Sequence, residues 1–343
     1  MISILSKLKD NFSKERFCVG LDIGTSALKI VRLKFAKDTV ELCGFDIEPS
    51  SLELGEVLKK IKHQHSADLV NISVSGPQTV IRYANFPRMS ASELRQALKF
   101  EAQKHIPFSV SEVNLDGYIL NDNLADNKML VLIAAAKKEL VAARLKSIEN
   151  AGFTVSLVDM DSVALINAFI FNNPLANNTE HKAVALLNIG ASVSNLDILE
   201  GALPRLSRDM HIASNTFTHR IMDIFGVDFN NADNLKLNPE NDAEKANKIK
   251  AAVESVLSNL ATEIRTSFDY YESQSASSVT KIFLSGGGIK FNGLKDMLAH
   301  LLGIEVEYWD PLGKIQINET VGVEKARAAS GQLAVAVGLA LRS

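Results

Sequence analysis

The sequence predicts an α/β protein built from two similar lobes, and three observations support that prediction. Its 343 residues exceed the size at which a single hydrophobic core usually stops growing. Strand-like and helix-like hydrophobic patterns follow one another along most of the chain. A strand, turn and strand near the amino terminus return near the middle of the chain, too far apart for a solenoid repeat, which indicates two similar halves.

The first copy of this pattern is a predicted β-hairpin over residues 17–33 whose turn can hold an anion. The turn itself consists of Asp22, Ile23, Gly24, Thr25 and Ser26. Gly24 lets the backbone turn tightly, so that N–H groups and two hydroxyls can point at phosphate oxygens. Asp22 can hold a hydrated Mg²⁺, and Lys29 supplies a positive charge from the second strand. The same turn also occurs in hairpins that bind nothing, so this motif alone leaves both interpretations open.

The second copy strengthens the interpretation of the first. Its turn residues Ile189, Gly190, Ala191 and Ser192 align without a gap with residues 23–26, and Asn188 precedes them. Each copy lies between an apolar strand and an alternating strand. Two such hairpins facing each other would hold a polyphosphate between them.

Composition and charge argue against several classes of function. The formal net charge of −3 and the scattered lysines predict no nucleic-acid binding. We expect a cytoplasmic protein, because no apolar run reaches membrane-spanning length and no secretory signal is recognised. Cys18 and Cys43, the only cysteines, are too isolated for a zinc site or a disulfide framework. Residues 1–16 form an amphipathic arm that lies on a membrane surface or, as we favour, packs on its own lobe.

The first lobe, residues 17–180, continues with a third strand, a helix and a fourth strand at 39–47, 51–63 and 69–75. Three antiparallel strands, a helix and another strand are typical of the opening of an RNase H-like lobe. His63 and His65 are expected to be exposed at a helix end. The segment from about 83 to 150 interrupts this order with a helix capped by Ser90 and further strands, which predicts a small α+β insertion.

Two further acids follow a predicted strand at residues 153–158. Asp159 and Asp161 stand between that strand and an apolar helix, a usual place for active-site groups in α/β folds. As plain helix caps they need no catalytic role. The second lobe is expected over residues 181–343, with a small-residue helix at 330–341 closing the chain.

Within the second lobe, a strand ends in three consecutive glycines, Gly286, Gly287 and Gly288. A loop that keeps three glycines indicates close backbone approach to a ligand, although a tight turn needs only one. Glu263 and Arg265 lie off the apolar stripe of a long helix predicted at 246–271. They face either a ligand or water.

The order of these parts resembles the actin, Hsp70 and sugar kinase superfamily over nearly the whole chain. The matching segments are two phosphate loops at 22–29 and 188–192 and an adenosine loop at 284–288. Within that superfamily, four segments are similar to motifs of the type IV pilus assembly protein PilM family: residues 19–24, 105–108, 263–265 and 337–342. The resemblance implies an actin-like fold of two RNase H-like lobes, with the insertion shared with the division protein FtsA.

The same resemblance implies that ATP and Mg²⁺ bind between the lobes. Phosphates would be held by Gly24, Thr25, Ser26, Gly190, Ala191 and Ser192, with Asn188 at the start of the second loop. Asp22 and Lys29 would serve Mg²⁺ and the β-phosphate. Adenine would be bordered by residues 286–288 with the stem of Lys290, and Glu263 would meet the ribose.

For function, the resemblance implies a scaffold that recruits the short cytoplasmic tail of an inner-membrane, PilN-like protein into a groove between the first lobe and the insertion. It would link the pilus motor to the assembly platform at the inner face of the membrane, as a possible homo-oligomer. One departure matters, because Asn188 stands where the second phosphate loop usually begins with Asp. A neutral amide cannot take a proton, so we expect ATP binding with slow or no hydrolysis.

Two alternatives of other classes remain at this point. A small-molecule kinase would use the same lobes, and Asp159 and Asp161 are its candidate general bases. A filament-forming, FtsA-like protein would be expected to carry a membrane-binding tail after the last helix, and here the sequence ends one residue after Arg342.

Overall fold

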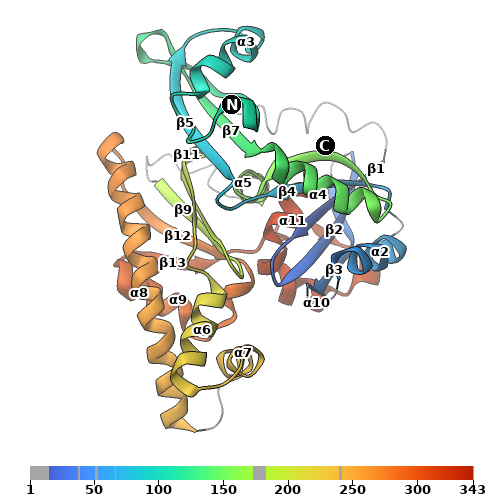
Figure 1. The fold of residues 1–343 in the computed structure, drawn as a ribbon, viewed down its shortest axis with the longest axis vertical. Coiled ribbons are helices and arrows are strands. Elements are labelled where there is room, and N and C mark those ends of the chain that lie inside the picture. The colour runs from blue at the N-terminus through green and yellow to red at the C-terminus, as the bar shows by residue number, and fades with distance from the viewer. Residues whose placement is uncertain are drawn as a thin grey trace.

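The computed structural model describes residues 15–37, 39–50, 53–65, 67–172, 183–238 and 242–342, and every structural statement below concerns these residues. Residues 1–14 of the expected amphipathic arm lie outside this set. The described chain contains three β-sheets with helices against their faces, which confirms the predicted α/β class (Figure 1).

The first large sheet has six strands in the order β14-β3-β2-β1-β4-β8. The hairpin β1–β2 and its neighbour β3 are antiparallel, while β4 pairs in parallel with β1 and β8 in parallel with β4. Their bounds are β1 Arg16–Ile23, β2 Ala27–Ala36, β3 Thr39–Pro49, β4 Leu69–Val74, β8 Thr154–Met160 and β14 Gln316–Ile317. Helices α2 (Leu54–His65) and α4 (Lys138–Asn150) contact each other and this sheet.

One expectation in this lobe is wrong. His65 was expected at an exposed helix end, and it is instead buried, with its Nε2 atom 2.8 Å from Oδ2 of Asp46 on β3. Gly44 explains the burial, because a Cβ atom there would lie 3.2 Å from the His65 ring. The last turn of α2 therefore packs on β3 and does not project into solvent.

The second large sheet has five strands in the order β11-β10-β9-β12-β13. Its strands are β9 Ala183–Ile189, β10 Ser194–Glu200, β11 Leu203–Met210, β12 Val279–Ser285 and β13 Glu305–Tyr308. The accompanying helices are α6 Ser214–Phe225, α7 Phe229–Leu237, α8 Ala243–Gln274 and α9 Leu294–Leu302. The apolar stripe of α8, including Ile249, Val253 and Leu257, joins Ala185 and Leu187 of β9 in one buried cluster. That burial is what the helical spacing of the stripe predicts.

The small third sheet has the strand order β5-β7-β6. It is built from β5 Thr79–Pro87, β6 Val113–Leu124 and β7 Lys128–Lys137, with α3 (Ala91–Ala102) packed on β6. The predicted capping box is present, since the backbone N–H of Ser90 donates to the Glu93 carboxylate and its Oγ accepts from the Glu93 N–H. β5 and β11, each at the edge of its own sheet, contact each other.

Two helices lie between the large sheets: α5 (Asp161–Asn172) and α11 (Ala334–Ala340) (Figure 1). One buried cluster contains residues of β2, β9, α5 and α11 together. The backbones approach very closely, because a Cβ atom at Gly338 would lie 1.8 Å from the carbonyl oxygen of Ala164, and one at Gly20 would lie 2.1 Å from that of Ala336. Glycine at these positions allows α11 to pack against both α5 and β1.

The elements also show what the sequence patterns missed. β11, α7, β13, β14 and α10 (Val323–Ala329) were not expected, and the closing helix is split into a 3₁₀ turn, Ser330–Leu333, and α11. The small sheet spans residues 79–137, and α4, which follows it, contacts α2 and β8 as well as β7. β14 and α11 return to the six-stranded sheet although they follow the second one in sequence. The domain limits given above stay a prediction.

Candidate functional site

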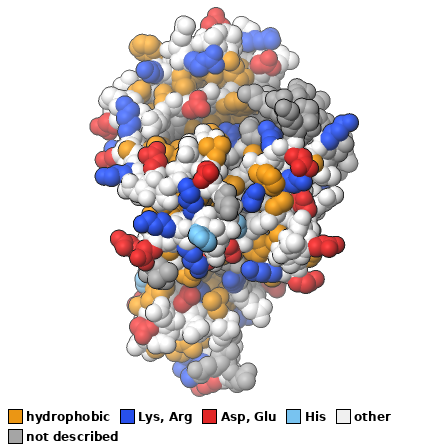
Figure 2. Space-filling view, turned by 90° about the vertical axis from the view of Figure 1, so that its right-hand side faces the viewer, with side chains coloured by type: hydrophobic (Ala, Val, Ile, Leu, Met, Phe, Trp, Pro, Cys, Tyr) orange, Lys and Arg blue, Asp and Glu red, His pale blue; other side chains and the backbone are white. Residues whose placement is uncertain are grey.

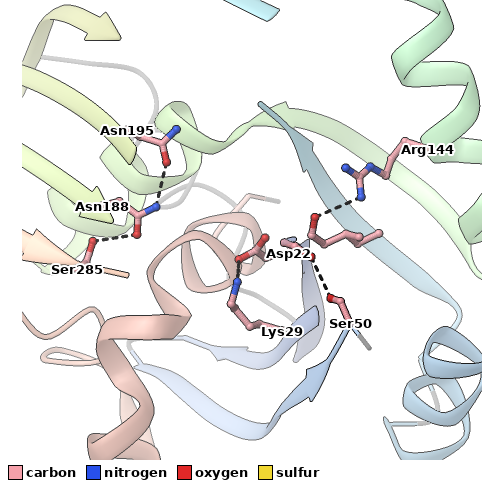
Figure 3. Close-up of polar contacts among 9 residues, drawn as sticks. Asp22, Lys29, Ser50, Arg144, Asn188, Asn195 and Ser285 are labelled. Carbon is pink, nitrogen blue, oxygen red and sulfur yellow. Dashed lines mark hydrogen bonds and ion pairs between the residues drawn. The ribbon is translucent and has the colours of Figure 1, made fainter. Parts of the chain in front are cut away.

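The turn between β1 and β2 carries an ion pair at its base. Asp22 and Lys29 are cross-strand partners, and Nζ of Lys29 lies 2.9 Å from Oδ2 of Asp22 (Figure 3). A Cβ atom at Gly24 would lie 2.9 Å from that Nζ atom and 3.0 Å from the carbonyl oxygen of Ala27. Glycine therefore allows the turn to close over the pair. The structure brings these three residues together as the sequence predicts.

Neighbouring elements fix the backbone of this turn. Ser50, at the end of β3, donates its N–H to the carbonyl oxygen of Ser26 at 2.9 Å and its hydroxyl to that of Gly24 at 3.1 Å. Arg144 of α4 donates to the carbonyl oxygen of Ile23 at 3.3 Å (Figure 3). The side chains at the tip, Thr25 and Ser26, are exposed. They are thus available to a ligand while the carbonyl oxygens are held by the protein.

The turn between β9 and β10 has a related backbone and a different support. Gly190 donates its N–H to the carbonyl oxygen of Val193 at 3.0 Å, and a Cβ atom at Gly190 would lie 2.6 Å from that oxygen. The start of α6 donates to the turn, from Ser214 to Gly190 at 3.0 Å and from Asn215 to Ala191 at 2.8 Å. Ser192 completes the turn and is partly exposed. The second turn is therefore fixed by a helix amino terminus.

A row of hydrogen-bonded side chains crosses the base of this second turn. The row consists of four side chains at successive cross-strand positions: Ser285 on β12, Asn188 on β9, Asn195 on β10 and Asp209 on β11. Ser285 Oγ donates to Asn188 Oδ1 at 3.3 Å, Asn188 Nδ2 donates to Asn195 Oδ1 at 2.9 Å, and Asn195 Nδ2 donates to Asp209 Oδ1 at 2.8 Å. Figure 3 shows the first two of these bonds. Both the oxygen and the nitrogen of the Asn188 amide are therefore hydrogen-bonded within the protein.

The glycine loop after β12 packs directly on the second turn. Gly286 has φ +98, and a Cβ atom there would lie 2.3 Å from the carbonyl oxygen of Ile189. A Cβ atom at Gly288 would lie 2.5 Å from Cγ2 of the same residue. Gly287 is exposed, and a Cβ there would approach nothing closer than 3.9 Å. Two of the glycines thus serve packing, and the middle one leaves open space beside the turn.

The two side chains predicted near adenosine, Lys290 and Glu263, lie next to different elements. Lys290 is exposed at the end of the 3₁₀ turn Gly287–Lys290, next to the glycine loop. Glu263 lies on α8 with its Oε2 atom 3.9 Å from Nη2 of Arg208 on β11. β11 is separated from β12 by two strands. The contact associates Glu263 with the edge strand, so its role at a ribose stays a prediction.

The two acids after β8 have different surroundings. The side chain of Asp159 is almost fully buried, and its Oδ2 atom lies 3.1 Å from Nε of Arg342 near the end of the chain. Burial raises the pKa of the Asp159 carboxyl, and the Arg342 charge opposes this shift. Asn71 of β4 binds the same end of the chain, donating to the carbonyl oxygens of Leu339 and Arg342. Asp159 thus holds the carboxyl-terminal segment in place.

Asp161 lies where the two halves of the molecule meet. Burial raises the pKa of its carboxyl to about 6, and the charges of Asp22 and Asp209 add to the shift. Hydrogen bonds from Ser73 and Ser75 oppose it. Asp161 is therefore within electrostatic reach of the first turn and of the row that supports the second.

A cavity of about 270 Å³ opens beside Asp161, where the first sheet, the small sheet and β11 converge. One wall is apolar, formed by Val74, Val80, Ile81, Phe108 and Met160. The charged and titratable residues at its border are Arg82, Asp161, Arg208, Asp209 and His211. Two hydrogen bonds tie β11 across it: Gly76 N–H donates to Asp209 Oδ2 at 2.8 Å, and the hydroxyls of Tyr83 and Ser207 lie 2.8 Å apart.

A family model described as type IV pilus assembly protein PilM matches residues 20–343. The chain belongs to the PilM family. It is similar to a chain of a PilM–PilN type IV pilus biogenesis complex, with 27% identity and a TM-score of 0.83 over 95% of this chain and 98% of that chain. It also resembles the ethanolamine utilization protein EutJ from Carboxydothermus hydrogenoformans, with 12% identity and a TM-score of 0.53 over 99% and 95% of the chains.

PilM-family membership places the chain in type IV pilus assembly. The likeness to EutJ concerns the fold alone, which is actin-like as the sequence motifs imply. The family match favours a pilus scaffold over the filament-forming and kinase alternatives. Among the helices that the structure describes, none has the length and apolar character to cross a membrane. On the face drawn in Figure 2, basic and acidic side chains are interspersed.

Sequence reasoning missed three features in and around the candidate site of this PilM-family structure. The strand β11 carries Ser207, Arg208 and Asp209, and the internal repeat could have predicted it, because the first hairpin is also followed by a third antiparallel strand. Asp197 is buried, and its Oδ1 atom accepts a hydrogen bond from the Ser207 hydroxyl at 2.5 Å. No sequence motif pointed to this residue. Buried Lys236 on α7 donates to Ser214, Thr218 and Asp233, and so anchors the helix start that supports the second turn.

Proposed function

We propose that this protein is a nucleotide-binding scaffold of a type IV pilus or related assembly machine. It binds ATP with Mg²⁺ between its two turns, hydrolyses it slowly or not at all, and holds the cytoplasmic tail of a PilN-like inner-membrane protein. The main support is the cavity where the first sheet, the small sheet and β11 meet, in a chain similar to part of a PilM–PilN complex. The protein would act in the cytoplasm, at the inner face of the membrane, with the pilus platform and motor.

The residues at the two turns fit a nucleoside triphosphate. The exposed hydroxyls of Thr25 and Ser26, the partly exposed hydroxyl of Ser192 and the glycine backbones of both turns suit phosphate oxygens, and Lys29 adds a partly buried positive charge. Asp22 supplies the carboxylate through which a hydrated Mg²⁺ is usually held when phosphates provide other ligands. The space beside Gly287 accepts a flat base, with the stem of Lys290 at its border.

Slow hydrolysis follows from the position of Asn188. A neutral amide cannot accept a proton from an attacking water, and its two ends are already bonded to Ser285 and Asn195. Asp161 keeps a carboxylate near the first turn, but its partners Ser73 and Ser75 hold it on the side of the cavity. Nucleotide binding is therefore separated from efficient turnover.

The cavity suits anchoring side chains of a peptide better than a free metabolite. Its volume of about 270 Å³ is below the range of about 300–1,000 Å³ usual for small-molecule pockets. It has an apolar wall together with cationic and anionic residues at its border, which can bind an extended segment with mixed side chains. Binding of such a tail would order it at an entropic cost, which preformed walls reduce.

A blocking substitution tests tail binding. Thr79 lines the cavity and is partly buried, so Thr79→Trp would fill the space that anchoring side chains need. We expect the variant to bind a fluorescent peptide of the PilN-like tail about tenfold or more weakly, at unchanged ATP affinity. Thr154→Trp, at an exposed position on β8, is the matched control and should bind as the unaltered protein does. Equal tail affinity in both variants would remove the cavity from the proposal.

A further inference from the structure

The row of side chains beneath the second turn has a fixed direction. A carboxylate only accepts hydrogen bonds, so Asp209 turns the Nδ2 group of Asn195 toward itself. The Asn195 Oδ1 atom then faces Asn188 and accepts from its Nδ2, which leaves Asn188 Oδ1 for the hydroxyl of Ser285. Each amide orientation thus depends on the next, and Asp209 sets the direction of all of them.

The same carboxylate also reaches across to the first lobe. Its second oxygen, Oδ2, accepts from the N–H of Gly76, which has φ +94 in the loop after β4 and borders the cavity. Ser207 lies two residues before Asp209 on β11, and its hydroxyl is hydrogen-bonded to that of Tyr83 in the small sheet. β11 is therefore tied to both other walls of the cavity, and through Asp209 to the base of the second turn.

We propose that Asp209 is a positioning residue that couples nucleotide at the second turn to tail binding in the cavity. The inference rests on the proposed function, since it needs both ligands. A nucleotide that shifts Ile189 and the glycine loop packed on it moves the ends of β9 and β12, where Asn188 and Ser285 lie. The row transmits that shift to Asp209, and the bond to Gly76 changes the cavity wall. By linkage, the tail changes nucleotide affinity by the same factor.

The direction of the row allows variants that separate bonding from charge. Asp209→Ala removes both acceptors and cuts the row from Gly76. Asp209→Asn can keep both bonds, because its Oδ1 accepts from Gly76 while its Nδ2 donates to Asn195 and the two asparagines turn over. Asn188→Asp places a carboxylate on each side of Asn195, whose single amide nitrogen cannot donate to both. The double variant Asn188→Asp with Asp209→Asn restores a fully bonded row in the reverse direction.

The test measures the affinity of the full-length protein for a fluorescent peptide of the PilN-like tail, with and without saturating Mg·ATP. The unaltered protein should show a change of about fivefold or more between the two conditions. Asp209→Ala and Asn188→Asp should reduce that ratio to less than about twofold, whereas Asp209→Asn and the double variant should keep it. Asp223→Ala, at an exposed position on α6, is the control and should keep the full ratio.

Each result has a distinct meaning. If both ligands bind but the unaltered protein shows no ratio, or if Asp209→Ala keeps it, the coupling is refuted and the proposed function stands. If Asp209→Asn loses the ratio as Asp209→Ala does, charge and not the bonded row is responsible, which also refutes the inference. If neither the tail nor ATP binds the unaltered protein, the proposed function itself fails. Thermal unfolding of each variant checks that a lost ratio is not lost folding.

Discussion

Each of the two hairpins has a cross-strand pair of side chains at the base of its turn, and the two pairs consist of different residue types. In the first hairpin, Asp22 faces Lys29 across the strands, with Nζ and Oδ2 2.9 Å apart. In the second, Asn188 faces Asn195, with Nδ2 and Oδ1 also 2.9 Å apart. A charged pair at the base of one turn thus corresponds to a neutral amide pair at the base of the other.

The two hairpins differ in both members of the pair and not in one residue alone. A lone Asp at position 188 would face the carbonyl oxygen of Asn195 as that amide is now oriented. Each hairpin instead keeps its pair electrically neutral and bonded, as buried polar groups require. The neutral pair has a further consequence, because an amide can both donate and accept, and this extends the row to Asp209.

The largest expected effect is on ATP turnover, when a carboxylate is placed at position 188 and the row of hydrogen bonds is kept. Asn188→Asp combined with Asp209→Asn should raise ATP turnover about 100-fold, at the low end of what a positioned general base supplies. ATP affinity should stay within about threefold of the unaltered protein, because the turn backbone is unchanged. Phosphate release and equilibrium titration of the same preparation measure the two quantities.

Either of two results contradicts this account of the second turn. Rapid turnover by the unaltered protein would mean that Asn188 does not limit hydrolysis. Turnover by the double variant that equals that of the unaltered protein would mean that a carboxylate at this position is not the missing group. Asp209→Asn alone serves as the control, since it reverses the row without adding a carboxylate at the turn.

A smaller effect separates the two pairs by their charge. Lys29→Met should weaken ATP binding about 30-fold or more, because the variant loses the proposed ion pair between Lys29 and the β-phosphate, and losing one partner of a charge pair across a binding interface costs about 2–5 kcal/mol. The equivalent change in the second pair, Asn195→Ala, removes no charge and should weaken ATP binding less than about fivefold. Lys37→Met, at an exposed position after β2, is the control for nonspecific charge loss. Equal losses at positions 29 and 195 would erase the distinction between the pairs.

The sequence predicts the parts of this site that depend on local backbone and misses those that depend on packing between lobes. The turns, their glycines and the Asp22–Lys29 pair follow from strand alternation and a repeated motif, and the structure shows them in place. The resemblance implied a groove between the first lobe and the insertion, but its lining could not be predicted from the hydrophobic pattern, because the residues come from β4, β5, α5 and β11, which meet only in the folded chain. Asp209 lay in a strand that the hydrophobic pattern did not reveal.

Packing between elements that are distant in sequence explains the other differences between expectation and structure. His65 has the sequence context of an exposed helix end, and only the absence of a side chain at Gly44 on the neighbouring β3 makes room for it. The return of β14 and α11 to the first sheet is likewise encoded in long-range contacts, such as Gly20 against Ala336. Such contacts have no periodic signature along the chain.

The last prediction concerns the pH dependence of stability and not ligand binding. It involves a carboxyl in the second half beside which the described residues place no cation, unlike Asp22. Burial raises the pKa of Asp197 from its usual 3.8 to about 8, and the nearby charges of Asp209 and Asp161 add to burial, while hydrogen bonds from Ser207 and Ser162 oppose it. In the folded protein this carboxyl therefore keeps its proton at pH values where the unfolded chain has lost it. Its contribution to stability is complete below about pH 4 and is lost as the pH rises toward 8.

Urea unfolding at about pH 5 and pH 8 measures this effect. The free energy of unfolding should fall over that interval by up to about 1.4 kcal/mol per pH unit from this group, and Asp197→Asn should remove that part of the slope, because an amide does not titrate. Glu254→Gln, at an exposed position on α8, should leave the slope as it is in the unaltered protein. An unchanged slope in Asp197→Asn would mean that burial does not hold the proton on Asp197 in the folded protein.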